Sequence, residues 1–227
     1  MRISKYISRS VSLALLALLP LGVAAQGRKQ IAVQQTDSIA TLRGVAVGAD
    51  LVGPIQLLVG SYGQVEGVVR VNLRDKYFPT VELGYGKADA NDDATRLHFK
   101  TSAPYGRIGL DFNLMKNKHD DYRLLAGFRY GYTSYKFDVD RPALTDPVWG
   151  GEAPYSAHGV KASCGWAEAV FSIDAKIIGP MRMGWSVRYK LRLHHDDGTI
   201  GSTWYVPGYG KQGSSRLGGT FNITFEI

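Results

Sequence analysis

Hydrophobic and polar residues alternate along eight segments of the chain between Arg43 and the carboxyl terminus. In the last of them, LGGTFNITFEI, Phe221, Ile223 and Phe225 fall on one face and polar residues on the other. A period of two places successive side chains on opposite sides of a pleated strand. The sequence therefore predicts eight β-strands, at residues 45–51, 65–73, 81–86, 107–114, 123–133, 166–176, 185–194 and 217–227.

The links between these strands alternate in length. Residues 74–79, 115–121 and 178–183 form short links, whereas 87–103, 138–159 and 195–215 form long ones. Residues 53–64, which contain the turn signal Gly53-Pro54, are intermediate. Short turns would then lie at one end of an antiparallel sheet and longer loops at the other. The pattern predicts an all-β fold in which eight antiparallel strands form an up-and-down barrel.

The strand count, the asymmetry of the links and the Phe-rich closing strand resemble the small bacterial outer-membrane barrels with the OmpA/OmpX-like architecture. That family commonly ends in an aromatic residue, and here Phe225 lies two positions before the final Ile227. The resemblance implies a transmembrane barrel with short periplasmic turns and longer external loops, surrounded by outer-membrane lipid and assembled by the barrel insertion machinery. It further implies a structural or interaction role, or that of an accessory subunit of an envelope complex.

The first 25 residues have the pattern of a secretory signal peptide. Basic residues lie near the start, an apolar run follows at 11–19, and Val23-Ala24-Ala25 offers a small-residue cleavage site. We therefore expect residues 1–25 to be a signal peptide, 26–42 a flexible periplasmic leader and 43–227 the barrel. The expected location is the cell outer membrane.

Composition narrows the functional classes. The formal net charge of the full chain is +7, and removing residues 1–25 takes away Arg2, Lys5 and Arg9 and no acidic residue, which leaves +4. An exported protein of such modest charge gives no reason to expect a nucleic-acid partner. Cys164 is the only cysteine, so no intrachain disulfide can form. Residues 26–227 contain no run of 18 apolar residues, so no transmembrane helix is expected.

In a membrane barrel the polar face of the strands points inward, so its residues indicate what fills the interior. Acidic and basic residues are nearly balanced on that face, and glycines leave room for long side chains between them. Buried charge is tolerated when it is paired, and an eight-stranded barrel is just wide enough to be filled by side chains. We therefore predict a lumen plugged by salt bridges among Asp50, Glu66, Arg70, Glu82, Arg107, Asp111, Arg123, Arg129, Glu168, Asp174, Lys176, Arg188, Lys190, Arg192 and Glu226.

A soluble, secreted lipocalin-like carrier is the alternative that alternation alone leaves open. Such a barrel also has eight strands but turns its apolar face inward around a small ligand. The two interpretations differ in the direction of Phe112, Phe171, Tyr189 and Ile223, which must point inward in a carrier and outward in a membrane barrel.

Candidate chemistry is sparse. His194, His195, Asp196 and Asp197 follow the seventh strand, where we expect a solvated rim; an outer-membrane enzyme acting on lipid or peptide is the alternative function. The acidic run that ends at Asp93 lacks the spacing of a calcium loop. The sequence therefore predicts no enzyme, no catalytic residue, no metal and no cofactor.

Two external segments could contact a partner protein. Ile55, Leu57 and Leu58 make the first link apolar, and Trp149 lies in a proline-containing stretch of the fifth. Apolar residues on loops are candidates for protein or membrane contacts.

Overall fold

The computed structural model describes residues 40–92, 96–145, 150, 152–196, 198, 201 and 203–227, without the side chains of 143–145 and 152–155. The chain divides into two units, Met1–Ser38 and Ile39–Ile227. The predicted signal peptide and almost all of the predicted leader lie outside the described residues.

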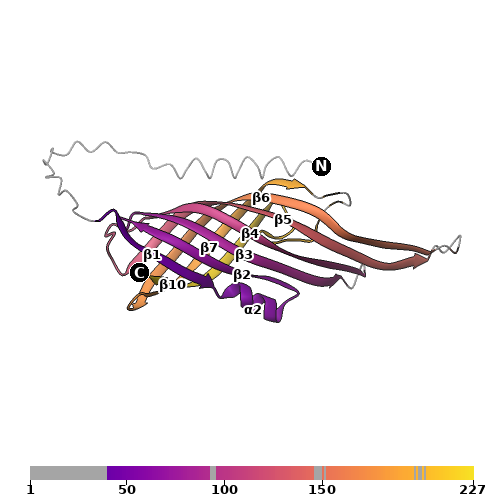
Figure 1. Ribbon diagram of the computed structural model, residues 1–227, viewed down its shortest axis with the longest axis horizontal. Helices are drawn as coiled ribbons and strands as arrows, with labels where there is room; N and C mark the ends of the chain where they lie inside the picture. Colours follow the sequence, from indigo (N-terminus) through magenta and orange to yellow (C-terminus); the bar gives the residue numbers. More distant parts are fainter. Residues whose placement is uncertain are drawn as a thin grey trace, which may run out of the picture. The chain divides into compact units, whose positions relative to one another are not determined.

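Eight antiparallel strands form one closed barrel in the order β1-β10-β7-β6-β5-β4-β3-β2 (Figure 1). This confirms the predicted fold class. The strands are β1 (Leu42–Asp50), β2 (Tyr62–Leu73), β3 (Tyr77–Asp92), β4 (Leu97–Asn113), β5 (Tyr122–Thr145), β6 (Glu152–Ile178), β7 (Met181–Asp196) and β10 (Ser215–Glu226).

The last strand closes the barrel against the first. Val47 of β1 pairs with Phe225 of β10, and Ala49 pairs with Ile223. The backbone N–H groups of Val45 and Ile227 each donate to the other residue's carbonyl, at 2.8 and 3.0 Å. Alternation therefore identified the closing strand correctly up to the carboxyl terminus.

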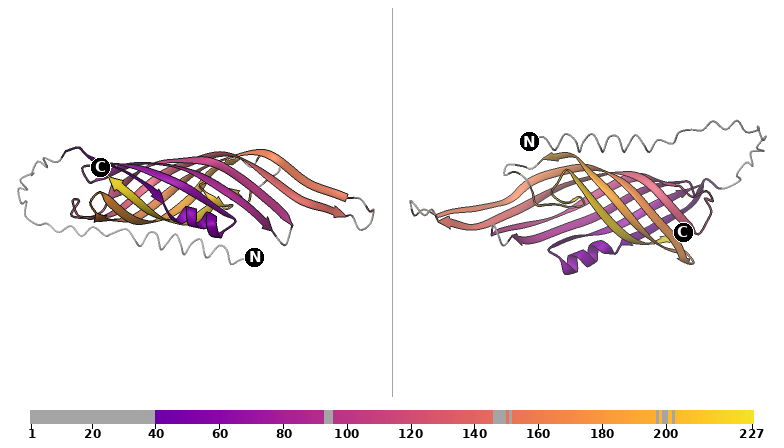
Figure 2. Two further views of the ribbon diagram at one scale, coloured as in Figure 1. Left: turned by 60° about the horizontal axis from the view of Figure 1, so that its bottom comes forward. Right: turned by 180° about the vertical axis from the view of Figure 1, so that it is seen from behind.

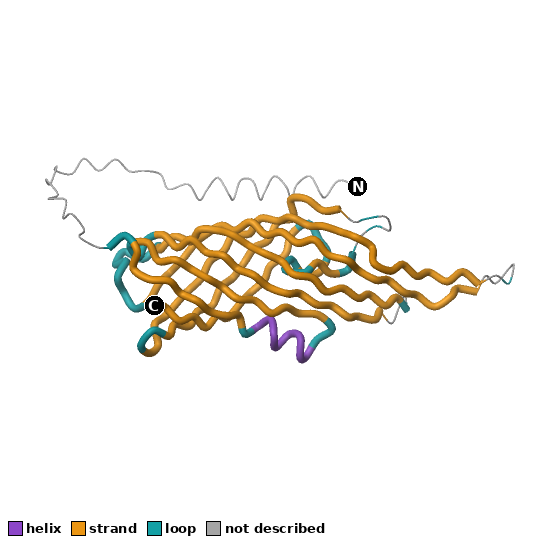
Figure 3. Tube along the Cα trace, in the orientation of Figure 1, coloured by secondary structure: helices purple, strands orange, loops and turns teal. Residues whose placement is uncertain are grey.

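Two of the three links that were predicted to be long are mostly strand. β3 and β4 pair from Tyr77 with Phe112 to Asp92 with Leu97, and β5 and β6 pair out to Thr145 with Glu152. Figures 2 and 3 show both hairpins running on past the rest of the barrel. Among the described side chains of residues 87–103 and 138–159 alternation continues, but there the polar residues face outward. A search for apolar residues on the outward face alone therefore ends each strand too early.

The barrel has a turn end and a hairpin end. At the turn end, links of a few residues join β2 to β3, β4 to β5 and β6 to β7. At the hairpin end, β3–β4 and β5–β6 extend outward, and the predicted long link between β7 and β10 contains the short hairpin β8 (Tyr205–Val206) and β9 (Gly210–Lys211).

The predicted first loop contains the helix α2 (Val52–Val59), which lies outside the barrel beside β2. The carboxylate of Asp50 accepts the backbone N–H groups of Val52 and Gly53, at 3.1 and 2.8 Å, and so satisfies two donors at the start of the helix. No helix in the described part of the chain is long and apolar enough to cross a membrane.

Candidate functional site

Charged side chains from four strands meet at the centre of the barrel. Glu82 of β3 is 1% exposed, and its carboxylate contacts three guanidinium groups. Arg188 lies 2.6 Å away, Arg107 2.8 Å and Arg129 3.2 Å. Such charge-assisted contacts compensate the loss of hydration that burial imposes on each ion.

Two further carboxylates surround Arg107 toward the hairpin end. Its guanidinium lies 2.9 Å from Glu66 and 3.1 Å from Glu168. Glu168 also lies 3.9 Å from the ammonium of Lys190. These residues come from β4, β2, β6 and β7, so the central ion pairs tie together strands on different sides of the barrel.

The ion pairs continue without a break toward the turn end. Each successive partner lies on another strand or, at the last step, in a turn, and every distance in the series is 3.8 Å or less. The contacts run from Arg129 to Asp111 (2.9 Å), Asp111 to Arg70 (3.8 Å), Arg70 to Asp174 (3.1 Å), Asp174 to Arg182 (2.9 Å), Arg182 to Glu226 (3.7 Å), Glu226 to Arg123 (2.7 Å) and Arg123 to Asp75 (3.3 Å). We call this series, together with the central ion pairs of Glu82, Arg107, Arg188, Glu66, Glu168 and Lys190, the lumen network.

Asp75, in the β2–β3 turn, ends the lumen network in a cavity of about 240 Å³ at the turn end. Its carboxylate accepts Asn72 Nδ2 at 2.7 Å, contacts Arg43 and lies 2.7 Å from His119 Nδ1. Burial alone would raise the pKa of Asp75, but the hydrogen bonds from His119 and Asn72 and the nearby arginines outweigh it and hold that pKa below its ordinary value.

Three residues predicted for the ion-pair interior have other surroundings. Asp50 accepts backbone N–H groups at the start of α2 and that of Phe221, at 3.0 Å. Lys176 is exposed at the turn end, where β6 bends at a register shift, and Arg192 is half-buried. None of the three takes part in an ion pair among the described residues.

Sequence reasoning missed other members of the network. Arg43 lies at the boundary between the predicted leader and the predicted barrel. Asp75 and Arg182 lie in links that were predicted to be short. Each of these residues lies within one or two positions of the end of a strand. So few strand residues remain beside it that the alternating pattern cannot be recognised there. Only the barrel geometry brings these ends together.

An aromatic cluster lies inside the barrel above the lumen network, toward the hairpin end. It includes the buried residues Phe99, Tyr105, Tyr135, Phe137 and Trp166. Two of them hydrogen-bond the network: Tyr105 Oη donates to Glu66 at 2.6 Å, and Trp166 Nε1 donates to Glu168 at 2.7 Å. The cluster therefore covers the charges and satisfies two of their acceptors.

Close approach of these rings depends on glycine. A Cβ added to Gly84 would lie 2.3 Å from the Tyr105 ring, and one added to Gly131 would lie 2.3 Å from the Trp166 ring. The sequence prediction that inward glycines make room for large side chains agrees with this geometry, although the neighbours here are aromatic.

The β8–β9 hairpin enters the barrel mouth and packs on this cluster. Tyr205, Val206 and Tyr209 are each at most 2% exposed. The carbonyl of Gly208 accepts Lys190 Nζ at 2.7 Å and Arg107 Nη2 at 3.2 Å, so the hairpin bonds directly to the lumen network. We call residues 203–211 the mouth hairpin.

The outer surface of the barrel is apolar where the interior is charged. Phe128 is 71% exposed, Trp185 65% and Ile108 63%. Phe171 and Tyr189 are exposed, while Phe112 and Ile223 are half-buried on the same outward face as their strand neighbours. The strands thus turn their apolar face outward, which contradicts the inward apolar face expected of a lipocalin-like carrier.

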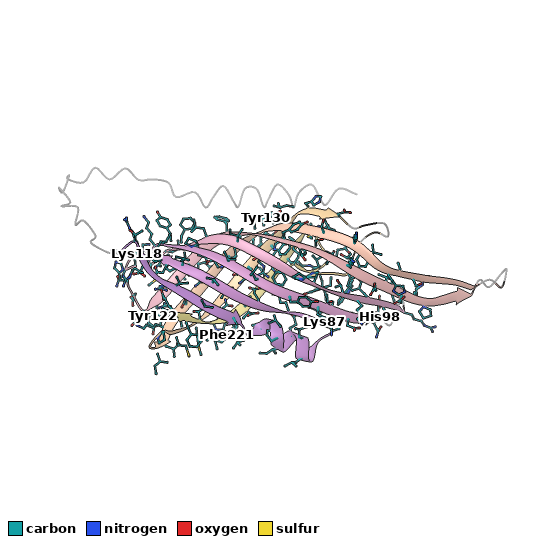
Figure 4. The ribbon with its side chains drawn as sticks, in the orientation of Figure 1. Lys87, His98, Lys118, Tyr122, Tyr130 and Phe221 are labelled. Atoms are coloured by element: carbon teal, nitrogen blue, oxygen red, sulfur yellow. The ribbon has the colours of Figure 1, made fainter. Side chains whose placement is uncertain are left out.

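That outward apolar surface ends partway along the strands. On β5 the outward residues Phe128, Tyr130 and Tyr132 are followed by Ser134 and Lys136. Figure 4 shows Lys118 and Tyr122 at the turn end and Lys87 and His98 toward the hairpin end, where the outward side chains are polar. We call residues 122–132 and the strand positions level with them the lumen half, and the remainder toward the tips the hairpin half.

The predicted rim residues lie at the end of β7. His194 is exposed, His195 Nδ1 lies 3.2 Å from the carbonyl of Ser163, and Asp196 accepts the N–H of Gly198 at 3.0 Å. Asp197 lies outside the described residues. Within those residues, no group of three or more His, Cys, Asp or Glu side chains is arranged to hold a metal ion.

The acidic run near the β3–β4 tip is part of a strand pair. Asp89 Oδ1 lies 2.8 Å from His98 Nε2 on β4, and this hydrogen bond lowers the pKa of Asp89. Asp93 lies outside the described residues.

Of the four candidate contact residues, the structure describes three. Ile55, Leu57 and Leu58 lie on α2, and Leu58 is 86% exposed. Trp149 lies outside the described residues.

Comparison with known proteins gives one family and one similar structure. The model of the family described as Domain of unknown function (DUF6048) matches residues 6–227. A search of curated proteins finds no match. Among solved structures, the chain is similar to a major outer membrane protein from Thermus thermophilus, with a TM-score of 0.42 and 14% identity, covering 83% of this chain and 100% of that one.

Proposed function

The chain belongs to the family described as Domain of unknown function (DUF6048), and for this member we propose a role as an integral outer-membrane anchor whose projecting β5–β6 hairpin binds a partner protein. The proposal includes no enzymatic activity and no open pore. The lumen network would plug the barrel, and the protein could serve as an accessory subunit of an envelope complex.

The reversal of polarity along each long strand carries the membrane part of the proposal. In the lumen half, charges point inward and Phe128, Tyr130 and Tyr132 point outward, as lipid contact requires. The ten steps from Tyr122 to Tyr132, at about 3.3 Å per residue and a tilt of about 40°, span about 25 Å, which matches the apolar band of outer-membrane barrels. A soluble barrel has no reason to expose such a band.

A closed interior supports the anchor over the pore. The lumen network fills the barrel from Lys190 to Asp75, and the mouth hairpin covers its upper end. Removing any one ion would leave its partners buried with fewer opposite charges around them, so the network resists opening.

The β5–β6 hairpin is the best candidate for partner contact. It continues as a two-stranded arm to the pair of Thr145 with Glu152, beyond the last pair of β3 with β4. Its outward residues Ser134 and Lys136 are exposed and polar, which suits a surface that faces water and proteins.

The membrane placement is tested by cell fractionation followed by gel mobility of unheated and heated samples. We expect the full-length protein in the outer-membrane fraction and a faster-migrating unheated form. Recovery as a soluble protein would refute the anchor. For the closed lumen, planar-bilayer recordings of the purified barrel should show no stable conductance, and steady open channels would refute the plug.

The partner-binding part is tested by shortening the arm. Replacing residues 142–155 by Asn-Gly should abolish photo-crosslinks formed from position 141 in intact cells and leave the heat-dependent mobility unchanged. The matched control replaces residues 92–97 of the β3–β4 tip in the same way. Crosslinks that survive removal of the arm, or that vanish equally in the control, would contradict the assignment.

A further inference from the structure

The barrel wall is incomplete between β2 and β10 toward the hairpin end. β1 ends at Asp50, where it pairs with Asn222 of β10, and its last pair with β2 joins Ala49 to Gly67. β2 extends to Tyr62 beyond that point, and β10 begins at Ser215. Residues 62–66 and 215–221 therefore border a gap in which no described strand lies.

The helix α2 covers only part of this gap. It packs against the free edge of β2, where a Cβ added to Gly63 would lie 2.7 Å from the backbone nitrogen of Leu57. Figure 2 shows the helix on the outer side of the barrel wall. It does not replace the missing strand, because it makes no ladder with β10.

A cleft of about 400 Å³ remains beside the helix. Gln56 of α2, Gln64 of β2, Lys211 of β9 and Gly218 of β10 lie on its different sides. We call it the lateral cleft. Three of its lining residues are basic, namely Lys190, Lys211 and Arg216, and none of the described lining residues is acidic.

Two of these cations have no carboxylate within ion-pair distance among the described residues. Lys211 Nζ lies 5.1 Å from the ring centroids of Tyr62 and Trp204, and the Arg216 guanidinium donates to backbone carbonyls, one of them that of Lys211 at 2.8 Å. Lys190 has one carboxylate, Glu168, at 3.9 Å. The lateral cleft thus carries positive charge that the lumen network does not neutralise.

The lateral cleft lies at the height where the outward apolar surface ends. Gln64 pairs with Gly86, the residue after the outward-facing Tyr85. Apolar side chains lie beside the opening: Leu217, which lines the cleft, is 75% exposed, and Val59, on the face of α2 that carries Val52 and Gln56, is 85% exposed. A ligand with its charged group in the cleft would place hydrocarbon on these residues.

We propose that the lateral cleft binds the phosphate headgroup of an anionic membrane lipid, with the acyl chains against Leu217 and the exposed side of α2. Phosphate oxygens accept from both Lys and Arg, and Arg adds a fork of donors. The inference rests on the proposed membrane placement and adds a ligand to it.

The test uses the folded full-length protein in an uncharged detergent, titrated with dihexanoyl phosphatidic acid and followed by native mass spectrometry. The wild type should bind one molecule. The double variant Lys211→Gln, Arg216→Gln should bind roughly a hundredfold more weakly, since each lost charged hydrogen bond contributes about a factor of ten. The single variant Lys211→Gln should fall between them.

The matched control is Lys100→Gln, Lys136→Gln, which removes the same charge from outward positions of the hairpin half and should bind like the wild type. Equal weakening in this control, or unchanged binding in the Lys211→Gln, Arg216→Gln variant, would overturn the site. Inorganic phosphate that competes as strongly as the lipid would overturn the lipid assignment. Heat-dependent mobility of every variant reports the barrel separately, so loss of binding and loss of the anchor fold are distinguishable.

Discussion

The two halves of β5 have the same pleat and opposite chemistry. In the lumen half, Arg123 and Arg129 point inward and Phe128 points outward. In the hairpin half, Tyr135 and Phe137 occupy the inward positions of the same parity, and Lys136 points outward. The strand does not slip between them, because Tyr130 pairs with Ala167 and Tyr135 with Ala162 in one unbroken register. The surroundings of the strand, rather than its backbone, determine which face is apolar.

The halves also hold their interiors together differently. The lumen half buries ions whose partners come from other strands, and removal of one partner is costly because the other ions stay buried. The hairpin half buries aromatic side chains, whose packing is less sensitive to any single polar contact. Four changes test this contrast, in order of decreasing effect.

Removing the central carboxylate should have the largest effect. Glu82→Ala leaves Arg107, Arg129 and Arg188 without their shared partner, and we expect a loss of about 3–5 kcal/mol in the free energy of unfolding. Denaturant unfolding of the barrel in lipid vesicles measures it. Lys136→Ala, an exposed outward change in the hairpin half, is the control and should stay within about 0.5 kcal/mol. A Glu82→Ala loss below about 1 kcal/mol would contradict the lumen network.

The next largest effect should come from a charge introduced on the outward face, which we expect to destabilise the lumen half and not the hairpin half. Phe128→Arg places a guanidinium where lipid is expected, at a cost of about 2–4 kcal/mol. Ser134→Arg adds the same side chain on the same face of β5, further toward the hairpin end, and should be nearly neutral. Folding yield into vesicles and the unfolding midpoint report both. Equal tolerance of the two substitutions would remove the distinction between the halves.

The contact between the mouth hairpin and the aromatic cluster can be tested with two glycines. A Cβ at Gly208, where φ is +81°, would lie 2.5 Å from the Tyr105 ring. At Gly210, where φ is +116°, it would meet nothing within 4 Å. Both alanine variants carry backbone strain of about 1–3 kcal/mol. Only Gly208→Ala should also expel the hairpin and speed its cleavage by protease. Identical cleavage rates would show that the hairpin does not depend on this packing.

The smallest effect concerns pH at the turn end. Because the folded-state pKa of Asp75 is lowered, its contribution to stability is present above the unfolded pKa and is lost as the pH falls through the folded value. The difference in unfolding midpoint between the wild type and Asp75→Asn should therefore be constant near neutral pH and shrink below about pH 3.8, the ordinary value. A difference that grows on acidification would contradict the cavity contacts.

Sequence alternation predicted the eight strands, the closing strand included, because an apolar outward face and a charged inward face give one periodic signal. It failed beyond Tyr132 in β5 and from Ala88 in β3. There the inward-facing residues become apolar and the outward-facing residues become polar, so the pattern is reversed. The partners within the lumen network could not be assigned, because contacts such as Arg70 with Asp174 join residues more than a hundred positions apart. The mouth hairpin and α2 were equally hidden, since both are short and lie in links.

A labelling scan along the outward face of β5, in a Cys164→Ala background, tests most directly whether the outward apolar band faces lipid. Single cysteines at positions 126, 128, 130, 132, 134, 136 and 138 would carry a spin label in reconstituted vesicles, and relaxation by oxygen and by a water-soluble nickel chelate would be compared. We predict oxygen-dominated relaxation through position 132 and chelate-dominated relaxation from position 134. Uniform access of the chelate to all seven positions would contradict it, because the apolar band would then face water.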